Sequence, residues 1–523
     1  MRTTVISVSV PRVTRPLSEG TGAHPVPTHT MNLPHRSATR RLLAATAALP
    51  LVLLAACSSD DDSEPTDDAS ETSSEQTSSE TESEDELDHD HGDDAVGAAT
   101  EAASVTPRLA ITYDGGIQVL DATTLEFEAD IPLEGFNRLN AAGDGRHLFV
   151  STTGGFQVLD GGAWAEPHGD HSHYFTTEPT LLDVTFGAET PGHVVVHDGR
   201  TALFDDGTGE ITVLDSSAVV EEDAEVREYT TPSAHHGVAV ELADGSLLVS
   251  EGDEDARTGI RVLDADGNEI AASDECPGVH GEAMAEGETV VIGCEDGALI
   301  YSGGEITKVT SPDDYGRIGN QAGSDVSPVV LGDYKSDPDA ELERPTRVSL
   351  IDTTTGELTL VDLPSSYTFR SLARGDDGEA LVLGTDGQIH VIDPATGELT
   401  ASYPVIDEWE EPEEWQEPRP AIFTLDGSAY VTDPATNTIY AIDIETGEVW
   451  NEATLDVTPN ELSGISGAVE AGSTEFGGED DAEGGGHEGH DHGDEGEEHE
   501  DHDHGDEGED HEGHDHDDES HTD

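Results

Sequence analysis

The sequence predicts an all-β fold, and more narrowly a single β-propeller, from three observations. Residues from about 105 to 462 consist of short β-rich runs separated by Gly, Asp and Asn turns. No long segment in this region shows the 3.6-residue period of a helix. A strand-ending marker, two apolar residues followed by Asp and a polar turn, recurs every 37 to 55 residues. That interval suits one propeller blade, which consists of four short strands with their turns.

The marker gives the expected number of blades. Its copies are Val119-Leu120-Asp121, Val158-Leu159-Asp160, Val213-Leu214-Asp215, Val262-Leu263-Asp264, Leu350-Ile351-Asp352, Val391-Ile392-Asp393 and Ala441-Ile442-Asp443, with Leu299-Ile300-Tyr301 as a degenerate copy. Eight markers over about 355 residues average about 44 residues each, so we expect eight blades, with seven as the alternative. A pair of β-sandwiches would not explain the repeated marker.

The N-terminus is typical of an exported lipoprotein. An apolar run over 42–56 follows Arg36, Arg40 and Arg41 and ends Leu54-Ala-Ala-Cys57, which resembles the bacterial lipobox. We therefore expect residues 1–56 to be a lipoprotein signal peptide, with Met31 as an alternative start. Lipidated Cys57 would then anchor the protein to the cell membrane on its extracytoplasmic side. A plain transmembrane anchor is the competing interpretation, although 15 residues are few for a membrane span.

Charge and composition separate the two ends from the propeller. The chain has 21 Lys and Arg against 116 Asp and Glu, a formal charge of −95, which opposes nucleic acid as a partner and also opposes docking on an anionic lipid surface. Residues 57–104 are mostly Ser, Glu, Asp and Thr, so we expect a disordered acidic linker. Residues 463–523 are predicted to be a disordered metal-binding tail rich in His, Asp and Glu.

The tail indicates binding of several transition-metal ions. Residues 477–523 hold ten His and 23 acidic residues and have neither Lys nor Arg. The candidate ligands are His487, His490, His492, His502, His504, His511, His514 and His516. Neutral imidazole suits zinc and other divalent transition metals, whereas calcium prefers oxygen ligands. An acidic solubilising tail with incidental His is the alternative interpretation.

Two further groups of His lie within the predicted propeller. His168, His171 and His173 form a compact cluster after the second marker. His236 and His280 stand one blade period apart, and each precedes a Gly and an expected innermost strand. Equivalent positions in neighbouring blades meet at the channel mouth, so we expect this pair to bind a metal ion. Either His197 or the 168–173 cluster is expected to complete the site. Packed or turn-capping histidines are the alternative.

The cysteines also fit export. Cys276 and Cys294 lie 18 residues apart, and an exported protein permits a disulfide between them. Two unrelated buried thiols are the alternative. Such a disulfide would hold the turn that carries His280.

The chain resembles the AztD-type family of periplasmic zinc metallochaperones, which accompany ABC-type zinc importers. The resemblance covers the propeller and rests on Pro167-His-Gly-Asp-His171-Ser-His173-Tyr, His193-Val-Val-Val-His197-Asp-Gly-Arg200, His235-His-Gly237 and Cys276-Pro-Gly-Val-His280-Gly-Glu282. It implies a zinc-binding propeller that hands zinc to a solute-binding protein and catalyses no reaction. The lipobox and the C-terminal His tract depart from the family. A propeller-type metal-dependent hydrolase and a passive surface interaction protein are the alternatives.

Overall fold

A computed structural model of the protein describes residues 99–469, apart from 170 and 222–223. These residues form sheets whose strands are antiparallel except for one short parallel pairing, and their one helical element is a 3₁₀ turn, η1 (Ser216–Ala218). Within this part of the chain, no helix is long and apolar enough to cross a membrane.

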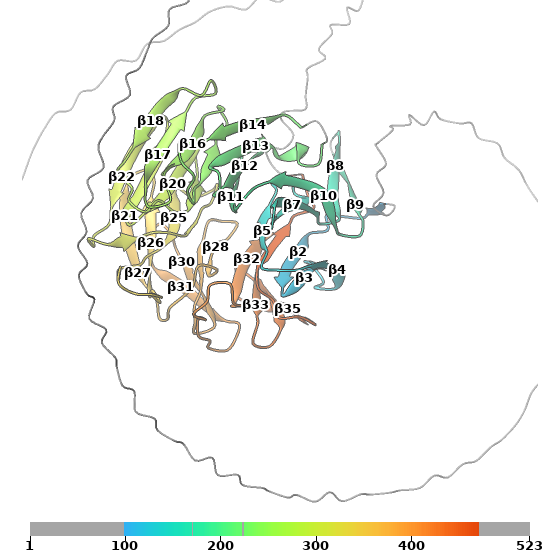
Figure 1. The fold of residues 1–523 in the computed structure, drawn as a ribbon. Helices are drawn as coiled ribbons and strands as arrows, with labels where there is room; N and C mark the ends of the chain where they lie inside the picture. Colours follow the sequence, from blue (N-terminus) through green and yellow to red (C-terminus); the bar gives the residue numbers. More distant parts are fainter. Residues whose placement is uncertain (1–98, 170, 222–223, 470–523) are drawn as a thin grey trace, which may run out of the picture. The chain divides into compact units, whose positions relative to one another are not determined.

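Eight sheets with a common core of four strands follow one another along the chain, as blades of a propeller (Figure 1). Blade 1 consists of β36 (Leu462–Ile465), β2 (Arg108–Tyr113), β3 (Gly115–Asp121) and β4 (Phe127–Leu133). Blade 2 consists of β5 (Arg138–Ala141), β6 (His147–Thr152), β7 (Gly155–Asp160) and β10 (Thr180–Gly187). Blade 3 consists of β11 (Pro191–His197), β12 (Arg200–Asp205), β13 (Glu210–Asp215) and β14 (Val226–Thr230). Blade 4 consists of β15 (Ala239–Glu241), β16 (Leu247–Gly252), β17 (Arg257–Leu263) and β18 (Glu269–Ser273).

The second half of the ring repeats this order. Blade 5 consists of β19 (Glu282–Ala285), β20 (Thr289–Cys294), β21 (Asp296–Ser302) and β22 (Glu305–Thr310), with β23 (Gly316–Arg317) added beside β21. Blade 6 consists of β24 (Gln321–Ala322), β25 (Val329–Asp333), β26 (Arg347–Asp352) and β27 (Glu357–Asp362). Blade 7 consists of β28 (Leu372–Arg374), β29 (Ala380–Leu383), β30 (Gln388–Ile392) and β31 (Leu399–Pro404). Blade 8 consists of β32 (Ala421–Leu425), β33 (Ser428–Asp433), β34 (Thr438–Asp443) and β35 (Val449–Thr454). The predicted all-β propeller with eight blades is confirmed.

The ring closes by joining the two ends of the folded chain in one sheet. β36 pairs with β2, with Arg108 opposite Ile465. β36 also contacts β32 of blade 8 and β5 of blade 2. The last strand therefore belongs to blade 1 and seals the ring against opening between the first and last blades.

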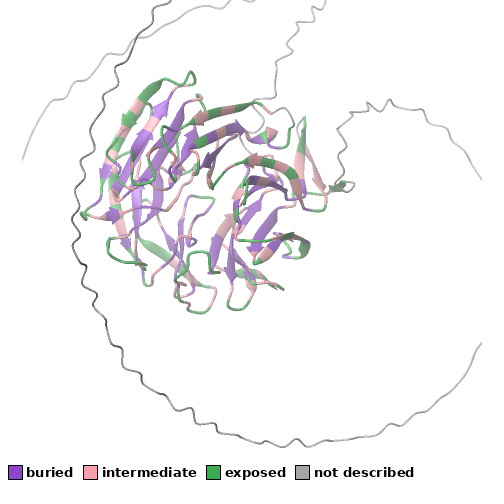
Figure 2. Ribbon diagram, in the orientation of Figure 1, coloured by how far each residue is buried: buried purple, intermediate pink, exposed green. Residues whose placement is uncertain are grey.

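The hydrophobic core lies between neighbouring blades. One cluster joins Val240 and Ile260 of blade 4 to Val290 and Leu299 of blade 5, and these side chains are at most 1 % exposed. The second and third strands of a blade, such as β25 and β26, are mostly buried, whereas outer strands such as β31 and β35 alternate between exposed and half-buried residues (Figure 2). The innermost strand β11 is mostly half-buried. Burial of both faces explains the apolar runs of the middle strands.

The marker closes the third strand of every blade, including the degenerate copy in β21. Its Asp folds the turn that follows. In blade 6 the Asp352 carboxylate accepts hydrogen bonds from the backbone N–H groups of Thr354 and Thr355, at 2.8 and 3.0 Å. The Asp therefore recurs from blade to blade because its side chain accepts hydrogen bonds from turn amides that would otherwise lack a partner.

One sheet lies outside the blade pattern. β8 (Ala163–His168) and β9 (His171–Thr176) form a hairpin inserted between β7 and β10 of blade 2, and β1 (Thr100–Ala102) pairs with β9. This insertion explains the longest marker interval. The predicted boundaries differ from the structure at both ends: β1 lies in the stretch predicted to be a disordered linker, and β36 extends three residues past position 462.

Candidate metal centre

Strand direction brings three histidines to one mouth of the ring. Each blade runs through antiparallel strands, so the innermost strands all begin at the same face. His193 lies near the start of β11, and His236 and His280 precede β15 and β19. These three neighbouring innermost strands therefore present their histidines at the same face.

The three imidazoles form one cluster with the dimensions of a metal site. One ring nitrogen from each of His193, His236 and His280 lies within 4.8 Å of the other two. The Nε2 atoms of His236 and His280 are 3.2 Å apart. The ring centroid of His193 lies 5.0 Å from that of His236 and 5.6 Å from that of His280. A single ion at the centre could be bound by all three.

Each ring is oriented through its other nitrogen, Nδ1. The Nδ1 of His236 lies 2.6 Å from the Asp206 carboxylate, and that of His280 lies 2.5 Å from the Gly319 carbonyl oxygen. The Nδ1 of His193 is 3.0 Å from the Glu282 carboxylate. Because carboxylates and carbonyls accept hydrogen bonds, Nδ1 of His236 and His280 carries the proton. The Nε2 lone pairs are then turned towards the centre, as in the metal-ligating histidines of proteins.

The electrostatics differ between the three rings. Burial lowers the pKa of His193, but the Glu282 carboxylate outweighs burial, and the net pKa is raised above the usual 6.5. Burial, with the neighbouring His193 and His236, holds the pKa of His280 well below 6.5. His280 is therefore neutral at physiological pH and available as a ligand.

Two glycines allow this close approach. A Cβ at Gly237 would lie 2.3 Å from the Phe204 ring. Gly281 has a φ of +73°, and a Cβ there would lie 2.2 Å from the Gln321 amide oxygen. The His-Gly pairs of the sequence thus place each histidine on a loop that packs tightly against the neighbouring strand.

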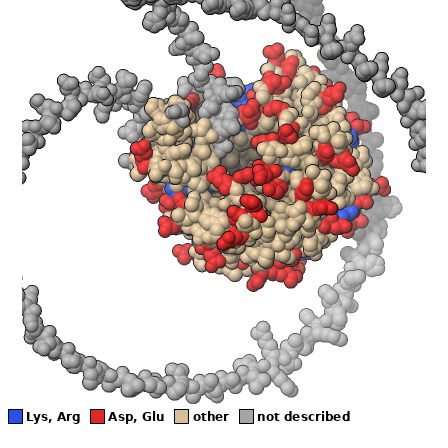
Figure 3. All heavy atoms as spheres, turned by 180° about the vertical axis from the view of Figure 1, so that it is seen from behind, with Lys and Arg blue, Asp and Glu red and all other residues tan. Residues whose placement is uncertain are grey.

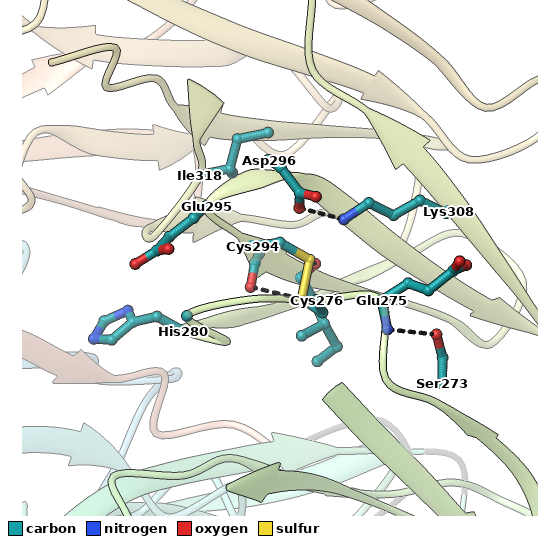
Figure 4. The surroundings of a disulfide bond; sticks show 12 residues. Ser273, Glu275, Cys276, His280, Cys294, Glu295, Asp296, Lys308 and Ile318 are labelled. Carbon is teal, nitrogen blue, oxygen red and sulfur yellow. Dashed lines mark hydrogen bonds and ion pairs between the residues drawn. A yellow bond between two sulfur atoms is a disulfide. The ribbon is translucent and has the colours of Figure 1, made fainter. Parts of the chain in front are cut away.

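The loop that carries His280 is covalently held. Cys276 and Cys294 form a disulfide with their Cα atoms 5.0 Å apart, the pair predicted from the sequence (Figure 4). The loop is also bound to the end of β20 by a hydrogen bond from the His280 N–H to the Gly293 carbonyl, at 3.1 Å. These links restrict the position of the His280 ring before any ion binds.

Carboxylates gather on one side of the cluster. A cavity of about 600 Å³ lies beside His236, and its lining includes the guanidinium of Arg257 and five carboxylates, those of Asp253, Glu254, Asp255, Asp274 and Glu295. On the face of the molecule shown in Figure 3, Asp and Glu are far more frequent than Lys and Arg. Such a surface raises the local concentration of cations.

The hairpin carries a second cluster. His168 and His171 are directly opposite in the β8–β9 register, and ligand atoms of His168, His171 and His173 lie within 4.8 Å of one another. His173 Nδ1 is 3.1 Å from the Glu101 carboxylate of β1. His168 and His171 are exposed, whereas the 193/236/280 cluster is half-buried. The sequence-predicted trio thus meets in space but belongs to a separate site.

His197 does not complete the channel-mouth cluster. It lies at the opposite end of β11, where its Nε2 is 2.8 Å from the Glu288 carboxylate. His193 occupies the expected position instead. The spacing of the histidines along the chain could have identified His193. It lies 43 residues before His236, close to the 44 residues between His236 and His280, whereas His197 lies 39 residues before His236.

The remaining sequence predictions lie outside the described residues. They are the lipidation site Cys57 and the tail ligands His487, His490, His492, His502, His504, His511, His514 and His516.

Fold and site define a β-propeller with two candidate metal sites built from histidines. The chain is 26% identical over 366 residues to the zinc chaperone AztD of Citrobacter koseri, covering 67% of this chain and 84% of that protein. The crystal structure of that AztD matches with a TM-score of 0.61 and 26% identity, over 69% of this chain and 98% of the other. A structure of apo AztD matches with a TM-score of 0.60 and 25% identity, over 69% of this chain and 99% of that chain. No family model matches.

The predicted resemblance to the AztD type is thus confirmed over the propeller. The matched relative is described as a chaperone and not as an enzyme, which agrees with the prediction of a non-enzymatic protein.

Proposed function

We propose that this chain is an extracytoplasmic zinc chaperone, anchored to the cell membrane through lipidated Cys57. It captures zinc and delivers it to the solute-binding protein of an ABC zinc importer. The observation that carries the proposal is the convergence of His193, His236 and His280, each oriented through Nδ1. The likeness to the zinc chaperone AztD supports zinc as the metal.

The donor set fits zinc chemically. Zinc favours imidazole nitrogen and tetrahedral coordination, and three imidazoles leave one position for another ligand. A chaperone needs such a position, because a ligand of the receiving protein must bind the ion before the donor releases it. The mouth location keeps the ion accessible: the His236 side chain is 40 % exposed.

The proposed division of labour has the tail collect ions and the propeller hold one tightly. A preformed site loses little conformational entropy on binding, whereas a tail of this composition must be ordered around each ion. The difference in affinity would direct zinc from the tail to the propeller and then to the partner.

The test is zinc titration of the full chain against a competing chelator, followed by mixing with the solute-binding protein. We expect one tight site above several weaker ones, loss of the tight site in the double variant His236→Ala/His280→Ala, and zinc transfer without release to the chelator. If the double variant keeps its tight site, the channel-mouth assignment is wrong. If zinc never reaches the partner, the delivery step is wrong.

A further inference from the structure

Arg138 lies beside the 193/236/280 cluster at the same mouth of the ring. It is the first residue of β5, the innermost strand of blade 2, and His193 lies near the start of β11, the innermost strand of blade 3. These two strands contact each other. The positive charge of Arg138 is also one of the charges that lower the pKa of His193. Arg138 is therefore a charged neighbour of the cluster on its blade 2 side.

The guanidinium of Arg138 is available to a ligand. Its side chain is 50 % exposed, and its one ion pair within the described residues joins Nε to the Glu461 carboxylate at 3.8 Å. That distance is too long for a hydrogen bond. An arginine presents its N–H donors as a planar fork that matches the two oxygens of a carboxylate. Arg138 thus keeps this fork open at the mouth.

The carboxylate of Glu461 is held by another arginine. Arg370, which precedes β28, pairs with Glu461 at 2.5 Å, and both side chains are at most 10 % exposed. Burial lowers the pKa of Arg370 to about 10; Glu461 acts against this effect, whereas Arg419 and Arg138 add to it. Positive charge is therefore incompletely compensated on this side of the mouth.

Charge is separated across the mouth. The five carboxylates of the cavity beside His236 belong to blades 4 and 5 and their connections. The arginines belong to other parts of the ring, with Arg138 in blade 2, Arg370 at the entry to blade 7 and Arg419 at the entry to blade 8. A cation is thus favoured on the His236 side, and an anion is favoured at the half-exposed guanidinium of Arg138.

A bound metal ion would strengthen this preference for an anion. Zinc held by three imidazoles keeps one position for a further ligand. The ion also places two positive charges near Arg138, which is unfavourable unless negative charge lies between them. A carboxylate meets both requirements, since one oxygen can coordinate zinc while the other accepts hydrogen bonds from the arginine.

We propose that Arg138 binds a carboxylate that supplies the fourth ligand of the ion held by His193, His236 and His280. This inference rests on the proposed function, because it requires a metal ion at the channel mouth. The carboxylate replaces a water molecule on the ion, and no covalent bond or oxidation state changes. An Asp or Glu of the receiving protein and a free carboxylic acid share this chemistry.

The test uses cobalt(II) in place of zinc in the full chain, because coordination geometry is visible in the absorption of cobalt. The spectrum of His236→Ala/His280→Ala, which keeps all other histidines, is subtracted to isolate the channel mouth. Sodium acetate is then added at constant pH and ionic strength. With the parent protein we expect a saturable change in this difference spectrum.

Arg138→Gln removes the charge and the fork at a half-exposed position, so the fold should persist. The affinity for acetate should fall about 10-fold, the effect of losing hydrogen bonds to a charged group. Metal affinity without acetate should rise, because a like charge is removed. Damage to the fold would instead lower both affinities. Arg138→Lys, which keeps the charge without the fork, should bind acetate with intermediate affinity.

Arg227→Gln is the matched control. Arg227 lies in β14, the outer strand of blade 3, and pairs with Glu241 at 3.1 Å. Its replacement should change neither affinity. Equal affinity for acetate in Arg138→Gln and the parent protein, or no response to acetate in the parent protein, would overturn the inference.

Zinc transfer to the solute-binding protein distinguishes the two sources of the carboxylate. If the carboxylate is the partner's, transfer should be about 10-fold slower from Arg138→Gln, and acetate should slow transfer from the parent protein. If it is a free acid, transfer should not depend on Arg138, although the response to acetate does. A cobalt spectrum without any response to acetate leaves the chaperone proposal standing. No difference between the parent spectrum and that of His236→Ala/His280→Ala would refute the channel-mouth metal site and both proposals.

Discussion

The Nε2 atoms of His236 and His280 lie 3.2 Å apart although the residues are 44 positions apart in the chain. Nδ1 of each ring faces an acceptor, so two neutral rings would direct their lone pairs at each other. This arrangement is favourable only when a proton or a metal ion lies between the two nitrogens. A cation bound between these two nitrogens should therefore stabilise this mouth of the propeller.

Replacing His193 should damage this site more than replacing its neighbour on the same strand. In His193→Ala the ion loses one of three imidazole ligands. Loss of a residue that only hydrogen-bonds to a ligand lowers metal affinity roughly 10- to 100-fold, so loss of the ligand itself should lower zinc affinity by more than that. His197→Ala is the matched control and should leave the tight site unchanged. Competitive zinc titration of the two variants distinguishes them. Equal losses would place the third ligand elsewhere.

Zinc affinity should begin to fall at a pH above 6.5. His193 has a pKa raised above its usual 6.5, because the Glu282 carboxylate outweighs burial, so it takes up a proton first as the pH decreases. A protonated ring cannot bind zinc. Burial and the neighbouring His193 and His236 hold the pKa of His280 well below 6.5, so His280 takes up a proton at lower pH than His193 does. Affinity measured between pH 5 and 8 should therefore fall in steps, with the first step from His193.

Glu282→Gln separates this effect from general protonation of the histidines. Without the carboxylate, burial dominates and lowers the pKa of His193, so the first loss of affinity should move to lower pH. The affinity at neutral pH should fall about 10-fold, because a partner that orients the ring is weakened. An unchanged pH profile would mean that another group causes the first step.

The fold was largely predictable because its repeat has a local physical cause. The marker Asp recurs since its side chain folds the turn after the third strand, as Asp121 does by accepting from the N–H groups of Thr123 and Thr124. The degenerate copy ending in Tyr301 is followed by Gly303 and Gly304, both at positive φ, which make the turn without Asp. The hairpin of blade 2 has no such marker and was not predicted.

The candidate site was only partly predictable. His236 and His280 share a local pattern of His followed by Gly. The side on which His193 projects depends on a register shift in β11 between Pro191 and Val194, which interrupts the alternation of side chains. His280 is oriented by the backbone carbonyl of Gly319, and a backbone group cannot be recognised from the type of side chain in the sequence. These features depend on the packed ring.

Removing the tail should change metal capacity and leave stability unchanged. Deletion of residues 477–523 should lower the zinc stoichiometry by several ions, because ten histidines are lost. The propeller should unfold at the same temperature without metal, since the described core ends at β36. Stoichiometry by titration and the melting temperature test the two halves. A lower melting temperature of the metal-free protein would show that the tail packs on the propeller.

Lipid attachment predicts a distinct behaviour for Cys57. In Cys57→Ala the precursor should remain unprocessed or the protein should leave the membrane fraction. The variant has no thiol to carry the acyl chains that would anchor the mature protein after the signal peptide is removed. Fractionation and intact mass of the expressed protein measure both. Normal processing with unchanged membrane retention would exclude the lipobox.

The disulfide should contribute to both stability and zinc affinity. Cys276 and Cys294 are buried and close a loop with a sequence separation of 18, for which loop-closure entropy predicts about 3 kcal/mol. Cys276→Ala/Cys294→Ala should lose about that much stability. It should also bind zinc more weakly, because the His280 loop then loses its covalent link to β20 and is held by hydrogen bonds alone. Zinc at about 100 times the variant's own Kd for the channel-mouth site should restore about 2.7 kcal/mol, since that site exists only in the folded state. Denaturant unfolding with and without zinc measures both terms. If stability falls while zinc affinity does not, the disulfide supports the fold but does not position His280.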